Sequence, residues 1–300
     1  MAKNREQQVN LYKTEYYHII SRCVRRTFLC GCYEIFKKIL HENKIDKEND
    51  YSNIEVNNQD SSPMLNYNHR REWLEDWLIK LAEAFAIEIL EYSFMSNHFH
   101  IVIHVNKELA ENLSDEEVIL RWLSVYKGDA SEEEFLNSTK TEREELLTKP
   151  IFKNRAEKYR ERLYSVSWFM KTLKEHIAKK ANKEENVTGH FWEGRFKSIP
   201  INVDNGYERL METMVYVALN PIRAAITDDP EYAHYTGLYQ RLSAEKVEKL
   251  LRKNKITEEE AQKMRRKREI LAQFEDEKKI KLQSYNQSYN GAMHYDETDT

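Results

Sequence analysis

The pattern of apolar and polar positions predicts three strands and one amphipathic helix in the first third of the chain. β-Branched and aromatic residues over 16–24 predict a strand. A helix is expected to begin near His69, because apolar residues then recur at helical spacing. The apolar run 86–94 and a second run that starts at His98 predict two strands joined by a tight connection. These two strands are expected to form the central hairpin of an antiparallel sheet.

Polar composition marks the segments between and after these elements. A helix is expected over 33–40, and the stretch 42–68, rich in Asn and Asp, is expected to be a loop or small insertion. Residues 107–150 are acidic and are predicted to form a helical insertion. Two capping-box patterns within it, Ser114–Glu117 and Ser131–Glu134, each predict a helix start.

Three further elements are predicted in the last third of the chain. A glycine-punctuated turn over 189–197 leads into another strand, and a helix is expected over 204–218. That helix should end near Asn220-Pro221, because the residue before a proline is steered away from helical dihedrals. A charged helical extension is expected over 246–283, with a capping box at Thr257–Glu260.

Charge changes the picture when it is counted by segment. The net charge of −4 argues against a uniformly basic surface, yet residues 151–197 contain 12 Lys and Arg against 6 Asp and Glu. Aromatic residues are interleaved with these cations, a composition that suits single-stranded nucleic acid. The same residues also fit the core of an amphipathic helix with a solvated charged face, so composition leaves both interpretations open.

Composition also indicates the cellular compartment of the protein. No apolar run approaches the roughly 20 residues that a membrane span needs, and the first residues do not resemble a signal peptide. A cytoplasmic protein without a membrane partner is therefore expected. The cysteines at 23, 30 and 32 match neither a zinc ribbon nor a redox pair, and we interpret them as reduced thiols.

Two histidines carry the first candidate chemistry. In a strand, His98 and His100 project from one face, where two imidazoles form half of a metal site. The alternative is that they are polar residues on the solvated face of a half-buried strand. His104 has the same parity but lies roughly 20 Å from His98 at about 3.3 Å per residue, so it is left out of the site.

A tyrosine and an asparagine form the second half of the proposed site. Tyr216 and Asn220 are four residues apart and therefore share one face of the predicted helix. A tyrosine hydroxyl becomes able to attack phosphorus beside a general base or a metal-polarised electrophile. A divalent ion held by His98, His100 and the Asn220 amide oxygen would leave positions open, which is the pattern of a catalytic ion.

Four motifs, in chain order, resemble a known family. They are Tyr17-His18-Ile19-Ile20-Ser21-Arg22, His98-Phe99-His100, Trp192-x-Gly194-Arg195-Phe196-Lys197 and Tyr216-x-x-x-Asn220-Pro221. Together they resemble the single-tyrosine HUH transposases, and among these the REP-associated tyrosine transposase-like proteins of bacterial chromosomes. The resemblance covers about residues 10–245.

The resemblance implies a fold and an activity. The fold would be α+β, with a ferredoxin-like antiparallel sheet and packed helices in a domain over 10–245. The activity would be cleavage of single-stranded DNA at hairpin repeats, giving a 5′-phosphotyrosine and a free 3′-hydroxyl, followed by strand transfer. The partner would be single-stranded or hairpin DNA, bound by a monomer or homodimer associated with the bacterial nucleoid.

The resemblance also implies roles for individual residues. Tyr216 matches the nucleophile, and His98, His100 and Asn220 match the ligands of a Mg²⁺ or Mn²⁺ ion. Imidazole ligands alone would suit zinc at least as well. The candidates for DNA contacts are Arg22, Arg25, Arg26, Lys171, Lys174, Arg195 and Lys197.

The chain departs from the compact family pattern in two places. The acidic insertion 107–150 would repel DNA unless it faces away from it. Beyond the family match lie the charged extension 246–283 and a tail over 284–300 that is expected to be disordered. Two other functions stay open: a domesticated hairpin-DNA-binding protein that no longer cuts, and a metal-dependent phosphohydrolase acting on small substrates without a covalent adduct.

Overall fold

The computed structural model describes residues 9–31, 66–204, 206–229, 232–241, 244–253 and 256–278. The helix expected over 33–40, most of the loop expected over 42–68 and the tail expected over 284–300 lie outside the described residues.

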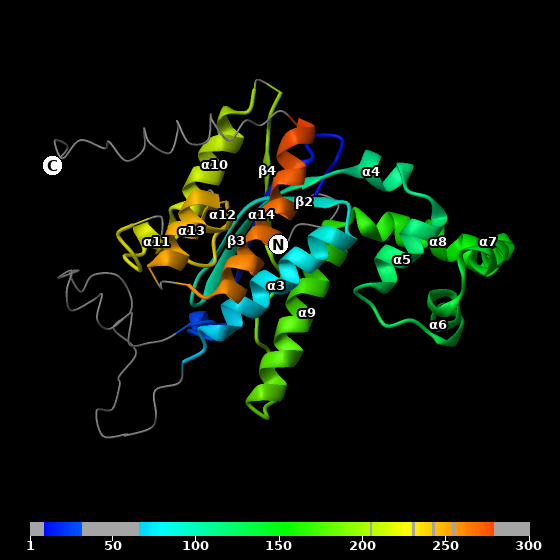
Figure 1. The fold of residues 1–300 in the computed structure, drawn as a ribbon, viewed down its shortest axis with the longest axis horizontal. Coiled ribbons are helices and arrows are strands. Elements are labelled where there is room, and N and C mark those ends of the chain that lie inside the picture. Colours follow the sequence, from blue (N-terminus) through cyan, green and yellow to red (C-terminus); the bar gives the residue numbers. More distant parts are fainter. Residues whose placement is uncertain are drawn as a thin grey trace.

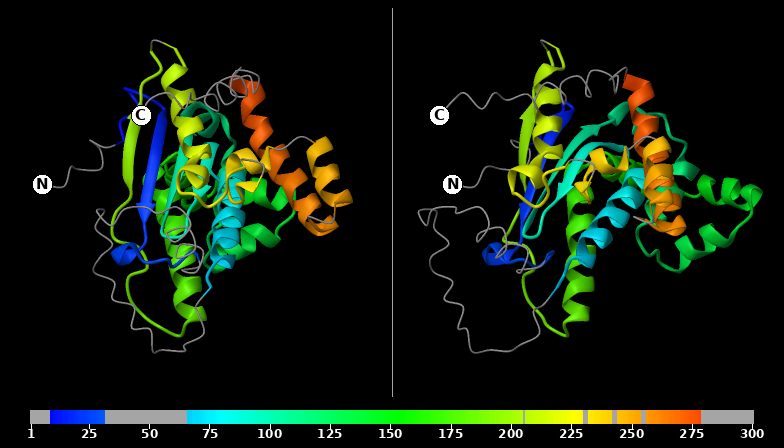
Figure 2. Two further views of the ribbon diagram at one scale, coloured as in Figure 1. Left: turned by 90° about the vertical axis from the view of Figure 1, so that its left-hand side faces the viewer. Right: turned by 60° about the vertical axis from the view of Figure 1, so that its left-hand side comes forward.

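A four-stranded antiparallel sheet forms the centre of the α+β fold (Figure 1). Its strands are β1 (Tyr16–Arg22), β2 (Ile87–Phe94), β3 (His98–Val105) and β4 (Lys197–Ile201). Their order across the sheet is β2-β3-β1-β4, and Figure 2 shows β1 and β4 side by side. All four predicted strands are therefore confirmed. The expectation that the β2–β3 hairpin is central was wrong, because β1 inserts between β3 and β4 and leaves β2 at an edge.

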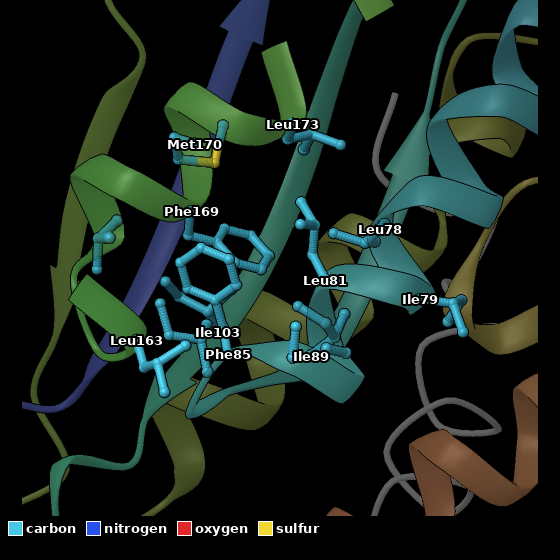
Figure 3. Close-up of a cluster of buried hydrophobic side chains, with 14 of the residues drawn as sticks. Leu78, Ile79, Leu81, Phe85, Ile89, Ile103, Leu163, Phe169, Met170 and Leu173 are labelled. Carbon is cyan, nitrogen blue, oxygen red and sulfur yellow. The ribbon is translucent and has the colours of Figure 1, made fainter. Parts of the chain in front are cut away.

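Two long helices pack on one face of this sheet. They are α3 (His69–Ala84) and α9 (Val166–Glu184). Figure 3 shows Leu78 and Leu81 of α3 and Phe169 of α9 gathered around Ile103 of β3. Each such side chain contributes roughly 1.5–3 kcal/mol through burial. This apolar packing fixes one face of β3 against the helices, so the alternate residues of β3 must point to the other face.

The helix α10 (Glu208–Ala218) packs on that other face. Leu210, Met214 and Val217 of α10 form a second apolar cluster with the sheet residues Tyr16, Leu90, Val102 and Ile201. The helix was expected to begin at residue 204 but begins at Glu208, because Gly206 has a φ of +116°, a conformation that no helix contains. A short helix, α11 (Asn220–Arg223), follows directly.

The predicted insertion is helical. It consists of α4 (Lys107–Asn112), α5 (Asp115–Leu123), α6 (Ala130–Asn137) and α7 (Lys140–Thr148), and α8 (Pro150–Leu163) follows it. The Ser114–Glu117 capping box is confirmed. The box expected at Ser131–Glu134 was wrong, because the capping box lies two residues earlier in the chain. Asp129 caps α6 and exchanges hydrogen bonds with Glu132.

The C-terminal extension packs against the domain. Helix α12 (Gly237–Gln240) precedes it, and the extension comprises α13 (Ala244–Arg252) and α14 (Glu258–Lys278). The capping box at Thr257 is present, since the Glu260 amide donates to Thr257 Oγ1 at 3.2 Å. Lys267 of α14 lies buried with its Nζ 2.6 Å from a carboxylate oxygen of Glu75 on α3. In the described ranges, no helix is both long and apolar enough to cross a membrane.

Candidate metal and nucleophile site

Strand β3 presents the histidine pair on the α10 face of the sheet. His98 lies opposite Arg22 of β1, and His100 lies opposite Ile20. Val102, the next residue of the same parity, belongs to the apolar cluster under α10. The two imidazole rings are 5.1 Å apart between centroids. The predicted common face of His98 and His100 is therefore confirmed, and it is the face that α10 covers.

Hydrogen bonds fix which nitrogen of His98 is free. Asn97 Nδ2 donates to the Arg26 carbonyl oxygen at 3.1 Å, so the amide oxygen of Asn97 faces the imidazole. His98 Nδ1 lies 2.6 Å from that oxygen and must donate to it. The lone pair of His98 consequently lies on Nε2. A metal-binding histidine typically has one nitrogen held by such an acceptor and the other left open.

Both histidines are held in their neutral form. Burial, followed by the nearby charge of Arg22, lowers the pKa of His98 to about 4. Burial, followed by the neighbouring imidazoles and Arg22, lowers the pKa of His100 to about 3. Near pH 7 both side chains therefore have an unprotonated nitrogen, as metal coordination requires.

Tyr216 of α10 lies against the histidines of the same chain. Its ring centroid is 5.9 Å from that of His100 and 6.2 Å from that of His18, in edge-to-face geometry. Tyr216 is 41% exposed, so this residue is accessible from solvent. The structure thus brings the predicted nucleophile Tyr216 beside the histidine pair of β3, although the sequence placed them on separate elements.

Asn220 continues the helical path one turn beyond Tyr216. The C-cap residue Leu219 keeps near-helical dihedrals, and its amide donates to Val215 at 3.0 Å. The amide nitrogen of Asn220 is buried without a hydrogen-bond partner among the described residues. Buried polar groups are normally satisfied, and the two ends of an amide exchange by a flip about its terminal torsion. With the amide flipped, its unpartnered end would be the oxygen, which is the atom that a metal ligand requires.

The donor set suits an open metal site. Two imidazole nitrogens and one amide oxygen would leave positions for water and substrate. Within the described ranges, no three His, Cys, Asp or Glu side chains are arranged as a complete metal-binding group.

Five of the seven predicted DNA contacts lie on β1, on β4 or in the turns next to these strands. Arg22 is the direct cross-strand neighbour of His98, and Lys197 lies opposite Ile20, in the same row of the sheet as His100. Arg25 and Arg26 are exposed in the turn η1 (Val24–Arg26) that follows β1. Arg195 is exposed in the turn before β4. The backbone amide of Glu193 in the same turn donates to the Arg22 carbonyl oxygen at 2.9 Å.

Lys171 and Lys174 lie elsewhere. Both belong to α9, which packs on the sheet face opposite to α10. Lys171 Nζ lies 4.6 Å from the centroid of the Trp168 ring. Lys174 Nζ donates to the Gly194 carbonyl oxygen at 2.6 Å and therefore holds the turn before β4. These two lysines do not join the histidine site.

Sequence reasoning missed two residues of the site. Arg223 of α11 has its guanidinium carbon 5.0 Å from the centroid of the Tyr216 ring. Its spacing of seven residues from Tyr216, two helical turns, was the only sequence signal. His18 of β1 is buried with its Nε2 2.8 Å from His100 Nδ1. No sequence pattern shows that β1 pairs with β3, so this contact is visible only in the fold.

His104 lies in a separate cluster, as expected. Its Nδ1 is 2.7 Å from a Glu88 carboxylate oxygen and its Nε2 is 3.2 Å from one of Glu15. Both ring nitrogens are therefore engaged away from the histidine pair.

Comparison with known proteins adds no family to these observations. No family model matches the chain, and no curated protein or solved structure is detectably similar to it. The functional assignment therefore depends on the residues of the site.

Proposed function

We propose that this chain is a metal-dependent, transposase-type endonuclease and strand transferase for single-stranded DNA at hairpin repeats. The main observation in support of this proposal is that the Tyr216 ring lies against the His100 ring within one chain. The strand–helix–strand–strand–helix–strand order of β1, α3, β2, β3, α9 and β4 also supports the proposal, because it matches the ferredoxin-like sheet that the family resemblance implies.

The proposed reaction is a phosphoryl transfer to tyrosine. The Tyr216 hydroxyl oxygen attacks the phosphorus of the DNA backbone, and the bond from phosphorus to the 3′ oxygen breaks. Tyr216 loses its proton and the departing oxygen gains one. The products are a 5′-phosphotyrosine and a free 3′-hydroxyl, so attack by a second 3′-hydroxyl reverses the step and joins two strands.

His98, His100 and Asn220 would hold the divalent ion, Mg²⁺ or Mn²⁺. When bound, such an ion orients the scissile phosphate and polarises it towards attack. The buried imidazoles stay neutral and keep their nitrogens available. Arg22, Lys197 and Arg223 add positive charge at the site and are expected to attract the DNA backbone.

The position of the acidic insertion is compatible with DNA binding. Helices α5, α6 and α7 project on the side of the molecule away from α10 and α11 (Figure 1). Their negative charge therefore lies away from the histidine pair and Tyr216. Since Tyr216 and His100 contact each other within one chain, a monomer suffices to assemble the proposed site.

Cleavage of an end-labelled hairpin tests the proposal. Single-stranded hairpin DNA from repeats flanking the gene is incubated with wild type, Tyr216→Phe or Tyr232→Phe, with Mn²⁺ or with chelator, and resolved on denaturing gels. Tyr232 is a matched control because it is about equally exposed, at 45%. We expect a metal-dependent, protein-linked product with wild type and Tyr232→Phe only. Binding of several hairpins without cleavage or adduct would favour a hairpin-binding protein instead.

A further inference from the structure

The buried His18 lies where it can set the tautomer of His100. In β1, His18 is two residues from Ile20, the cross-strand partner of His100, and therefore points to the same face of the sheet. The two imidazole rings are nearly parallel, with centroids 5.0 Å apart and planes at 28°. His18 is 7% exposed, so the contact is shielded from water.

The short contact between the two rings is a hydrogen bond and not a place for a shared ion. His18 Nε2 and His100 Nδ1 are 2.8 Å apart. A cation at about 2.0–2.1 Å from each of two imidazole nitrogens in tetrahedral geometry would hold them roughly 3.4 Å apart. The pair therefore shares one proton.

Which of the two rings carries that proton decides whether His100 Nε2 can bind a metal. If His18 carries it, the proton of neutral His100 is on Nε2, and this nitrogen cannot coordinate a metal. If His100 carries it on Nδ1, its Nε2 keeps a lone pair. His98 already has this second arrangement, because Asn97 accepts from its Nδ1.

We propose that His18 is a positioning residue that accepts a hydrogen bond from His100 Nδ1 and so directs the lone pair of His100 Nε2 towards the ion. This proposal rests on the proposed function and deepens it. Asn97 and His18 then perform the same task for His98 and His100: each accepts from Nδ1 and fixes the ring, as outer partners of metal-bound histidines do. The acceptor for His100 is a neutral imidazole in place of the more usual carboxylate or carbonyl.

Two substitutions separate the hydrogen bond from the shape of the ring. His18→Phe keeps a flat ring but removes the acceptor, whereas His18→Gln supplies an amide oxygen that can accept. His176→Phe is the matched control, because His176 stacks on Trp77 at 3.9 Å, on the other side of the sheet. Thermal unfolding identifies the variants that fold.

The first measurement is the affinity of each full-length variant for Mn²⁺ alone, by electron paramagnetic resonance. We expect His18→Phe to bind at least about tenfold more weakly than wild type, His18→Gln to recover part of that loss, and His176→Phe to match wild type. Affinity of His18→Phe within twofold of wild type would overturn the proposal.

The second measurement is the tautomer of His100 in metal-free, ¹⁵N-histidine-labelled protein, by long-range ¹H–¹⁵N correlation spectra. We expect the Nδ1–H form in wild type and His18→Gln, and a shift towards Nε2–H in His18→Phe. An Nε2–H form in wild type would overturn the proposal. If wild type binds no Mn²⁺, the proposed metal site fails, and the wild-type spectrum alone decides the role of His18. The same spectrum decides that role if His18→Phe does not fold.

Discussion

The Tyr216 ring meets the His100 ring edge to face, with their planes at 83°, although one lies on α10 and the other on β3. The apolar residues Leu210, Met214 and Val217 position Tyr216 for this contact, because they pack α10 against the sheet. The next exposed position of the helix then falls beside the histidines. Packing of an ordinary amphipathic helix thus places the candidate nucleophile next to a candidate metal ligand.

Removal of one candidate ligand should abolish metal binding without unfolding the protein. We expect His98→Ala and Asn220→Ala to lose measurable Mn²⁺ binding in calorimetry, since each removes one of only three protein donors. His104→Ala is not a suitable control because it leaves one carboxylate oxygen of the buried Glu88 without the imidazole that faces it, so His176→Ala serves instead. Unchanged Mn²⁺ affinity in Asn220→Ala would place the ion elsewhere.

Arg223 is expected to contribute to the chemical step. Its guanidinium lies next to the Tyr216 ring, where a phosphate attached to that tyrosine would need a cation. Loss of a hydrogen bond to a charged group costs about 1.5–3 kcal/mol, so Arg223→Ala should slow single-turnover cleavage roughly 10- to 100-fold. Arg223→Lys should recover part of the rate. Arg209→Ala, an exposed arginine near the start of α10, is the control, and an equal loss in that variant would show only a general charge effect.

The stability of metal-free protein should fall below pH 6.5. The folded state lowers the pKa of His98 to about 4, whereas an unfolded histidine has a pKa near 6.5. Between these values the unfolded state binds the extra proton, so stability rises with pH by about 1.4 kcal/mol per pH unit for each such histidine. We expect His98→Gln to flatten the pH dependence of urea unfolding between pH 6 and 5. An unchanged slope would mean that His98 titrates normally in the fold.

Lys267 should anchor the C-terminal extension. Its ammonium group lies 2.6 Å from Glu75 and 2.8 Å from Asp76, and Glu75 is only 3% exposed. Breaking a buried pair on one side costs about 3–5 kcal/mol, so Lys267→Met should destabilise the protein by roughly 3 kcal/mol in urea unfolding. The exposed pair of Lys263 with Glu72 provides the control, and Lys263→Met should cost less than about 1 kcal/mol. Equal effects in the two variants would contradict this account.

Local patterns predicted the parts of the site, and long-range pairing decided how they meet. Strand alternation was enough to place His98 and His100 on one face, and helical spacing was enough to align Tyr216 with Asn220. The contact of His18 with His100 depends on the pairing of β1 with β3, which no local pattern encodes. The same limit made the position of the β2–β3 hairpin in the sheet unpredictable.

The surface assignments and the element boundaries show two further limits of sequence reasoning. Lys171 and Lys174 are basic and lie among aromatic residues, yet packing of α9 places them on the opposite face from the site. Composition records the charge of a helix but not the face of the sheet that the helix covers. At α6, the helix is capped by Asp129 and Glu132, although Ser131 and Glu134 have the same spacing, so the pattern alone could not decide between them.

The most direct test of the central claim is the mass of the protein after reaction with a single-stranded hairpin in Mn²⁺. We predict that intact mass spectrometry of wild type detects a covalent adduct equal to the 5′-phosphorylated product strand, and that peptide mapping places it on Tyr216. Tyr216→Phe should gain no mass. An adduct on another residue, or hairpin binding by wild type without any adduct, would contradict the assignment of Tyr216 as the nucleophile.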